Sequence, residues 1–218
     1  MKQTIFKLGL LLTLITATTM FFSSCKDGLT KDIHNIIPKD IMKKFKELGI
    51  EINEGNNPPN IEGTYFVSPF VLVKSNFNDN MLPGDRFSDM EITFSGQNNT
   101  KQTVVTDYIN GTQTGNGLGS FITGSGNKFS VYYECSGTYF GLPFKSVDIY
   151  SGEITSTGIK NFQYATIVTE PNTYTIKRGE GRLAHDSDKF SEKISSTGAP
   201  LKIKDATSDE TLKSLLSK

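Results

Sequence analysis

The stretch FSVYYECS, residues 129–136, alternates apolar and polar side chains along its length. The apolar positions share one face of an extended chain, and they are Phe129, Val131, Tyr133 and Cys135. Alternation with a period of two is the pattern of a β-strand that buries one face. The stretch therefore predicts a strand in a sheet with one buried face, and its partners must lie on either side of it in the chain.

Similar segments occur on both sides of this stretch, and turn-forming residues separate them. They cover residues 61–74, 90–95, 103–109, 118–123, 145–154, 161–170 and 174–184. Pro69 breaks the first segment and predicts a bend or an edge, while Asn110-Gly111 is typical of a hairpin turn. The even spacing predicts an all-β fold, an antiparallel barrel of about eight strands, with an open sandwich as the alternative.

Composition limits the classes of function. The chain has 218 residues, with 23 basic and 23 acidic side chains and no tryptophan. This balance, without a basic stretch interleaved with aromatic residues, gives no indication of a nucleic-acid partner. The length allows one ordinary domain with a linker, or two small domains.

The N-terminal segment has the pattern of a secretory signal. Lys2 and Lys7 precede an apolar run at residues 8–22, which is shorter than the roughly 20 apolar residues of a membrane-spanning helix. Two serines then precede Cys25. Small residues directly before a cysteine, after an apolar run, resemble the lipobox of bacterial lipoproteins, in the looser form of Bacteroidetes-type proteins.

This resemblance implies that residues 1–24 are a signal peptide and that Cys25 becomes the first residue of the mature protein, carrying acyl chains such as palmitate. Lys26 stands where the inner-membrane retention signal has an aspartate, which implies delivery to the outer membrane, on its periplasmic or its surface face. The alternative is an ordinary signal peptide with an incidental cysteine. If Cys25 carries lipid, Cys135 has no disulfide partner, and the core must stabilise the fold.

Residues 25–37 are predicted to form a tether and residues 38–48 a helix, with linker to residue 59. The apolar positions recur at helical spacing, with lysines opposite, and they are Ile41, Met42, Phe45 and Leu48. Such a helix could lie on a membrane surface, but acids interrupt its basic face. We therefore expect a packing helix that covers one end of the barrel domain, residues 60–190. The tail, residues 191–218, is expected to contain a short helix.

A helix, a break, Gly63-Thr-Tyr65 at the start of the first strand and about eight antiparallel strands together resemble the lipocalin or calycin barrels. That family opens its first strand with Gly-x-Trp, so the resemblance makes Gly63 and Tyr65 a structural pair. It also implies an arginine from the last strand across that ring, either Arg178 or Arg182. The family encloses a small apolar ligand, which implies a cavity lined by Tyr65, Phe94, Val131 and Tyr133.

Motifs of common catalytic and metal sites are missing or lack their context. The sequence contains neither His-Glu-x-x-His nor Gly-x-Ser-x-Gly. His185 beside two aspartates is typical of a solvated turn, and Cys135 of a buried, inert thiol. Gly115-x-Gly117-x-Gly119 precedes a strand, so it predicts a flexible hairpin rather than a phosphate loop. Acids and amides in residues 76–85 could bind Ca²⁺, but their spacing is more typical of a solvated loop.

These observations predict a non-enzymatic protein without metal or cofactor, a lipid-anchored binding module that carries a small apolar ligand or presents loops. The alternative is an interaction subunit of an outer-membrane assembly with a surface protein as partner, and an unrecognised enzyme is third. A carrier needs a hollow barrel, whereas a packed interior with an exposed apolar patch favours a protein partner. Residues 54–65, EGNNPPNIEGTY, resemble the opening of uncharacterised Bacteroidetes-type lipoproteins, which implies no function.

Overall fold

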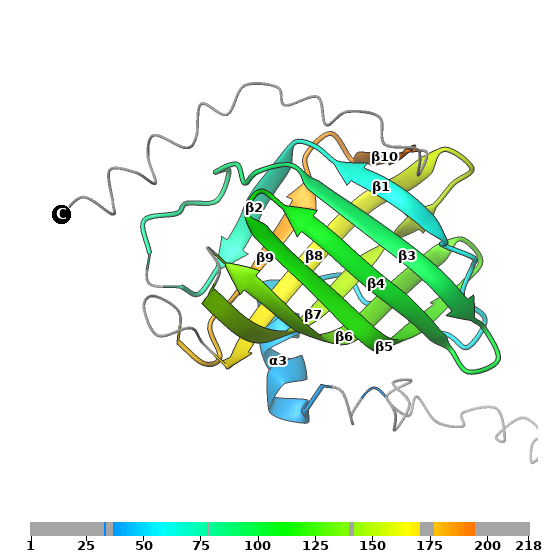
Figure 1. Cartoon of the computed structure of the whole chain (residues 1–218), viewed down its shortest axis with the longest axis horizontal. Coiled ribbons are helices and arrows are strands. Elements are labelled where there is room, and N and C mark those ends of the chain that lie inside the picture. Colours follow the sequence, from blue (N-terminus) through cyan, green and yellow to red (C-terminus); the bar gives the residue numbers. More distant parts are fainter. Residues whose placement is uncertain (1–32, 34–36, 78, 140–141, 171–176, 195–218) are drawn as a thin grey trace, which may run out of the picture.

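The computed structural model describes residues 33, 37–77, 79–139, 142–170 and 177–194 (Figure 1). Cys25, the signal peptide and the predicted tail helix lie outside the described residues. The elements are helix α3 (Lys39–Leu48) and the strands β1 (Gly63–Val67), β2 (Phe70–Ser75), β3 (Met90–Asn98), β4 (Thr103–Asn110), β5 (Gln113–Ser125), β6 (Lys128–Tyr139), β7 (Leu142–Ile154), β8 (Gly158–Glu170), β9 (Gly181–Asp186) and β10 (Phe190–Ile194).

The strands form one antiparallel sheet that closes on itself. Neighbouring strands follow the order β10-β1-β3-β4-β5-β6-β7-β8, and β10 also pairs with β8, which completes a ring of eight strands. We call this ring the barrel. The all-β, antiparallel prediction is confirmed, and the closing pair decides against an open sandwich.

The first and last segments of the sheet are each divided into two short strands, and the two breaks lie at the same level of the sheet. Ser68 and Pro69 separate β1 from β2, as the proline predicted, and residues 187–189 separate β9 from β10. β1 pairs with β10, and β2 pairs with β9. The backbone N–H of Ser187 donates to the carbonyl of Pro69 over 3.0 Å, so the two breaks lie side by side.

Three strand boundaries differ from the sequence prediction. The last segment was expected at residues 174–184, but residues 177–180 form a turn around Gly179, whose φ of +84° is left-handed. β10 carries the barrel to Ile194 rather than residue 190. The glycine-rich stretch was expected to be a flexible hairpin, but it is part of β5. A glycine stands at position 115 because the Tyr108 ring lies 2.5 Å from where a Cβ would be.

Alternation along the strands produces two apolar layers, one inside the barrel and one outside it. On β6, Tyr133 lies in the inner layer with Phe129 and Val131, while its neighbour Tyr132 lies in the outer layer. The outer layer is covered by α3, whose apolar face contacts β8 and β9 (Figure 1). Ile33 and Ile37, from the predicted tether, are buried in the same layer.

Helix α3 therefore packs, as expected, but on the outer wall of the barrel rather than over one end. Its apolar spacing is confirmed, with all four predicted apolar positions buried. Gly49 ends the helix in a left-handed conformation, and its N–H donates to the carbonyl of Phe45 over 3.1 Å. Alternation along β7 places Val147 and Ile149 on the outside of the barrel, and α3 covers this apolar surface and buries it.

Replacing Phe45 with alanine should lower the free energy of unfolding by about 3–5 kcal/mol, because the ring is fully buried between α3 and the barrel. Urea denaturation measures the change. Lys43→Ala on the exposed side of the same helix is the matched control and should change stability by no more than about 0.5 kcal/mol. Equal stabilities of Phe45→Ala and the wild type would show that the helix does not pack on the wall.

Candidate functional site

The four residues expected to line a ligand cavity all lie in the packed inner layer. Tyr65, Phe94, Val131 and Tyr133 are buried. Phe94 contacts the Tyr65 ring at a centroid distance of 6.1 Å, and Tyr133 stacks on Tyr150 at 5.4 Å. Tyr150 in turn stacks on Tyr164 at 5.1 Å. Contacting rings thus occupy the interior around these positions, and a ligand carried there stays a prediction.

Gly63 and Tyr65 lie on β1, where a cation from the last strand covers the ring, but neither candidate arginine supplies it. The ammonium of Lys193 on β10 is 5.8 Å from the Tyr65 ring centroid and donates to the carbonyl of Glu62. Arg182 instead lies over the Phe77 ring at 4.4 Å. Lys193 was not a candidate because the barrel was expected to end at residue 190, whereas β10 extends to Ile194.

A buried carboxyl group is the strongest chemical feature of the interior. Asp148 on β7 is fully buried and accepts hydrogen bonds from the hydroxyls of Thr166 and Tyr164, at 2.6 and 3.0 Å. Burial raises its pKa from an ordinary 3.8 to about 6. The hydroxyls of Tyr133 and Tyr150 bond to each other nearby, at 2.7 Å. Asp148 was not predicted as a site residue. The sequence signal that could have identified it is its position between Val147 and Ile149 in a predicted strand.

Cys135 and His185, the two residues weighed for catalysis, lie on different strands, β6 and β9. Cys135 is buried, as predicted, and burial raises the pKa of its thiol well above the usual range. His185 is partly buried, which lowers its pKa. Asp186 accepts a hydrogen bond from the Ser191 hydroxyl at 2.8 Å and from the Ser68 N–H, so it holds the corner between β9 and β10.

The polar loop between β2 and β3 uses its oxygens within the fold. Asp79 pairs with Arg182, the Asp85 carboxylate accepts the N–H of Leu82, and the Asn76 side chain accepts the N–H of Gly181. Among the described residues, no three His, Cys, Asp or Glu side chains are placed to hold a metal ion. These three side chains therefore have partners within the fold, as expected of a polar loop.

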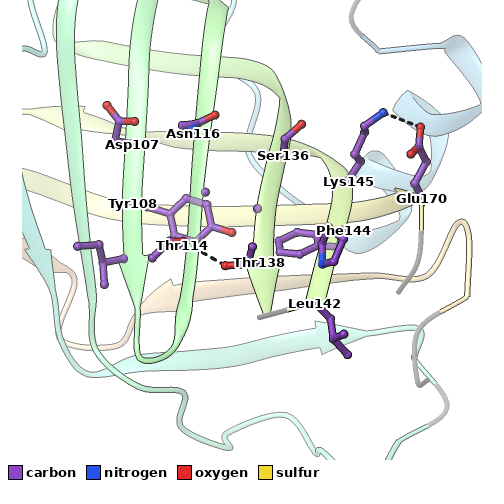
Figure 2. Close-up of a pocket in the computed structure, with 14 residues that line it drawn as sticks. Asp107, Tyr108, Thr114, Asn116, Ser136, Thr138, Leu142, Phe144, Lys145 and Glu170 are labelled. Carbon is purple, nitrogen blue, oxygen red and sulfur yellow. Dashed lines mark hydrogen bonds and ion pairs between the residues drawn. The ribbon is translucent and has the colours of Figure 1, made fainter. Parts of the chain in front are cut away.

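A pocket lies on the outer wall of the barrel, against β4–β8, and has a volume of about 820 Å³ (Figure 2). We call it the outer groove. Its first row of side chains crosses five strands in direct register, from Asp107 to Asn116, Ser136, Lys145 and Glu170. Lys145 points outward because Val147, two residues along, belongs to the outer layer. Figure 2 shows this row on neighbouring strands.

The second row of the outer groove is less polar. Ile109, Thr114, Thr138 and Pro143 follow one another across β4–β7. The hydroxyls of Thr114 and Thr138 are 3.4 Å apart, and Ile109 is 51% exposed. Leu142, at the start of β7, is 40% exposed and also lines the groove. The outer groove therefore offers exposed apolar side chains beside polar ones.

Charge in the outer groove is confined to its first row. The Lys145 ammonium and the Glu170 carboxylate form an ion pair at 2.9 Å, and Glu170 raises the pKa of Lys145. Both side chains are more than half exposed, so the pair contributes little stability. Asp107, at the other end of the row, has no ion-pair partner among the residues that the structure describes. The groove can thus bind through hydrogen bonds, one free carboxylate and apolar contact.

Two glycines form part of the groove floor. Gly115 and Gly137 lie between the outward residues of the two rows, and the inner side of each backbone carries an aromatic ring. The rings are those of Tyr108 and Phe144, at 2.5 and 2.8 Å from where the Cβ atoms would be. Side chains at these positions would displace the rings.

The free energy of unfolding of Asp148→Asn, relative to that of the wild type, should rise by about 2–3 kcal/mol when the pH is raised from 4 to 7. The raised pKa of Asp148 means that its stabilising contribution is complete below pH 3.8 and is lost as pH rises through about 6. The asparagine variant does not have this loss. Urea denaturation at both pH values measures the difference. Asp107→Asn, on the exposed groove, is the control, and an equal gain there would contradict the assignment to burial.

Comparison with known proteins adds no relative. No protein-family model, no curated protein and no solved structure matches the chain. Within the described residues, no helix combines the length and the apolar character needed to cross a membrane. The candidate site is therefore interpreted from its own geometry.

Proposed function

We propose that this protein is an exported, lipid-anchored, non-enzymatic binding module that contacts a protein partner through the outer groove. The N-terminal pattern that ends at Cys25 supports export and anchoring, and Lys26 supports delivery to the outer membrane. In this role the chain is an interaction subunit of an outer-membrane assembly, held near its partner by acyl chains.

The observation that carries this proposal is the contrast between the two sides of the barrel wall. Inside, aromatic rings stack at centroid distances such as 5.1 Å between Tyr150 and Tyr164. Outside, the groove has a volume of about 820 Å³ and carries the exposed apolar residues Ile109 and Leu142. Contiguous apolar patches rimmed by polar residues mark protein interaction sites, and Ile109 and Leu142 supply the apolar part of this groove. This contrast favours a partner outside the barrel over a ligand carried inside.

A second candidate uses the same groove for a small amphipathic molecule. The volume of about 820 Å³ falls within the roughly 300–1,000 Å³ range of small-molecule sites. The polar row would bind the polar end of such a ligand, and Ile109 and Leu142 its apolar end. Native mass spectrometry of protein purified from its host distinguishes the two candidates, because a retained small molecule adds a discrete mass.

A photo-reactive amino acid at Asn116 or Ser136 should yield one discrete protein adduct when the chain is expressed in its host. The same amino acid at Ser95, exposed on β3 away from the groove, is the matched control and should not yield it. Ser136→Trp should reduce the Asn116 adduct at least about tenfold, since the indole would project into the groove directly beside Asn116. Ser95→Trp should leave it unchanged. Equal adducts from Ser95, or none from either groove position, would refute a groove partner.

Cys25→Ser should abolish incorporation of labelled fatty acid into the chain, since the cysteine thiol is the expected acceptor. Cys135→Ser is the control and should label as the wild type does, because that thiol is buried in the barrel. Labelled fatty acid in the Cys25→Ser variant would mean that the lipobox resemblance is misleading.

A further inference from the structure

The exposed side of α3 carries a row of lysines. Lys39, Lys43 and Lys46 are spaced by four and then three residues, so they lie on one side of the helix. All three are exposed, opposite the buried apolar face. Only Lys43 has an acidic partner among the residues that the structure describes, namely Glu47 at 3.9 Å. A loose, highly exposed pair of this kind does not neutralise the row.

The fold brings cations from two other segments to this helix. Lys74 on β2 donates to the carbonyl of Glu47 over 2.7 Å, at the end of α3. Lys44 donates to the carbonyl of Gly179 over 3.3 Å, which places Lys177 and Arg178, both exposed, beside the helix. We call these seven residues the basic patch: Lys39, Lys43, Lys44, Lys46, Lys74, Lys177 and Arg178.

Charge is asymmetric across this surface. The three acids on the same segments are Asp40, Glu47 and Glu180, against seven cations in the basic patch. The whole chain has equal numbers, 23 of each sign. An ordinary solvated face mixes both signs, so the excess of cations here is a local feature that tertiary contacts assemble.

The expected lipid anchor is close to the basic patch in the chain. Ile33 and Ile37 are buried in the same outer layer as α3. The chain between Cys25 and Ile33 can extend over at most roughly 30 Å, at 3.3–3.6 Å for each residue. A barrel held by this short tether therefore has its α3 side near the bilayer to which Cys25 is attached. This step rests on the anchoring part of the proposed function.

We infer that the basic patch binds the anionic headgroups of a phospholipid surface and orients the barrel against it. Juxtamembrane cations attract anionic lipids, and each one strengthens binding by about fivefold. The apolar face of α3 is occupied by the barrel wall, so the contact is electrostatic and does not insert the helix. The acyl chains supply attachment, and the basic patch supplies orientation.

The test uses residues 25–218 with Cys25→Ser, so that the anchor does not contribute. Vesicles of phosphatidylcholine with about 30 mol % phosphatidylglycerol should sediment with this protein at low salt, and vesicles of pure phosphatidylcholine should not. High salt should release it, since the attraction is screened within about 10 Å at moderate ionic strength. Lys39→Gln, Lys43→Gln and Lys46→Gln combined should weaken binding at least about tenfold, as three cations are removed.

The matched control is the combination of Lys101→Gln, Lys160→Gln and Lys189→Gln, three exposed lysines outside the basic patch. It removes the same charge and should bind as the unmodified chain does. Equal loss in both triple variants, equal binding to neutral vesicles, or no binding by the unmodified chain would overturn the inference. Ser136→Trp should bind vesicles normally, so a failure here is separate from a failure of the groove proposal.

Discussion

Closure of the ring is the constraint on which the rest of the structure depends. Among the residues that the structure describes, each of the eight ring strands pairs with a ring neighbour on both sides. The first and last strands are broken side by side, and the breaks at Pro69 and after Asp186 meet through a backbone hydrogen bond from Ser187. The buried carboxylate of Asp186 adds bonds to the Ser68 N–H and the Ser191 hydroxyl. One corner thus keeps both strands in register.

A closed ring separates an inside from an outside, and the chain uses them differently. The inside is filled by aromatic side chains and by Asp148, an acid whose hydroxyl partners compensate only part of its burial, as the raised pKa shows. The outside is divided between α3, which covers β8 and β9, and the outer groove over β4–β8. Stability therefore comes mainly from the interior and from the covered wall, and the uncovered wall carries the groove proposed here for a partner.

Local patterns in the sequence predicted much of the fold. The inward positions of β6 follow from alternation, and the buried face of α3 from helical spacing. The break at Pro69 was predicted because proline cannot donate a ladder hydrogen bond. The glycine-rich stretch was misassigned because Gly115 accommodates the Tyr108 ring, a neighbour from another strand. The last strand was misplaced because a turn at Gly179 interrupts a pattern that looks continuous.

The sequence by itself predicted most of the strands, the helix, which side chains share a face and an anchor at Cys25, because these depend on neighbours along the chain. Only the tertiary structure decided which strands adjoin and in what register. The row from Asp107 to Glu170, the position of Lys193 over Tyr65 and the basic patch around α3 all join residues far apart in the sequence. Their positions depend on hydrogen bonds between distant segments, and one-dimensional periodicity contains no record of those pairings.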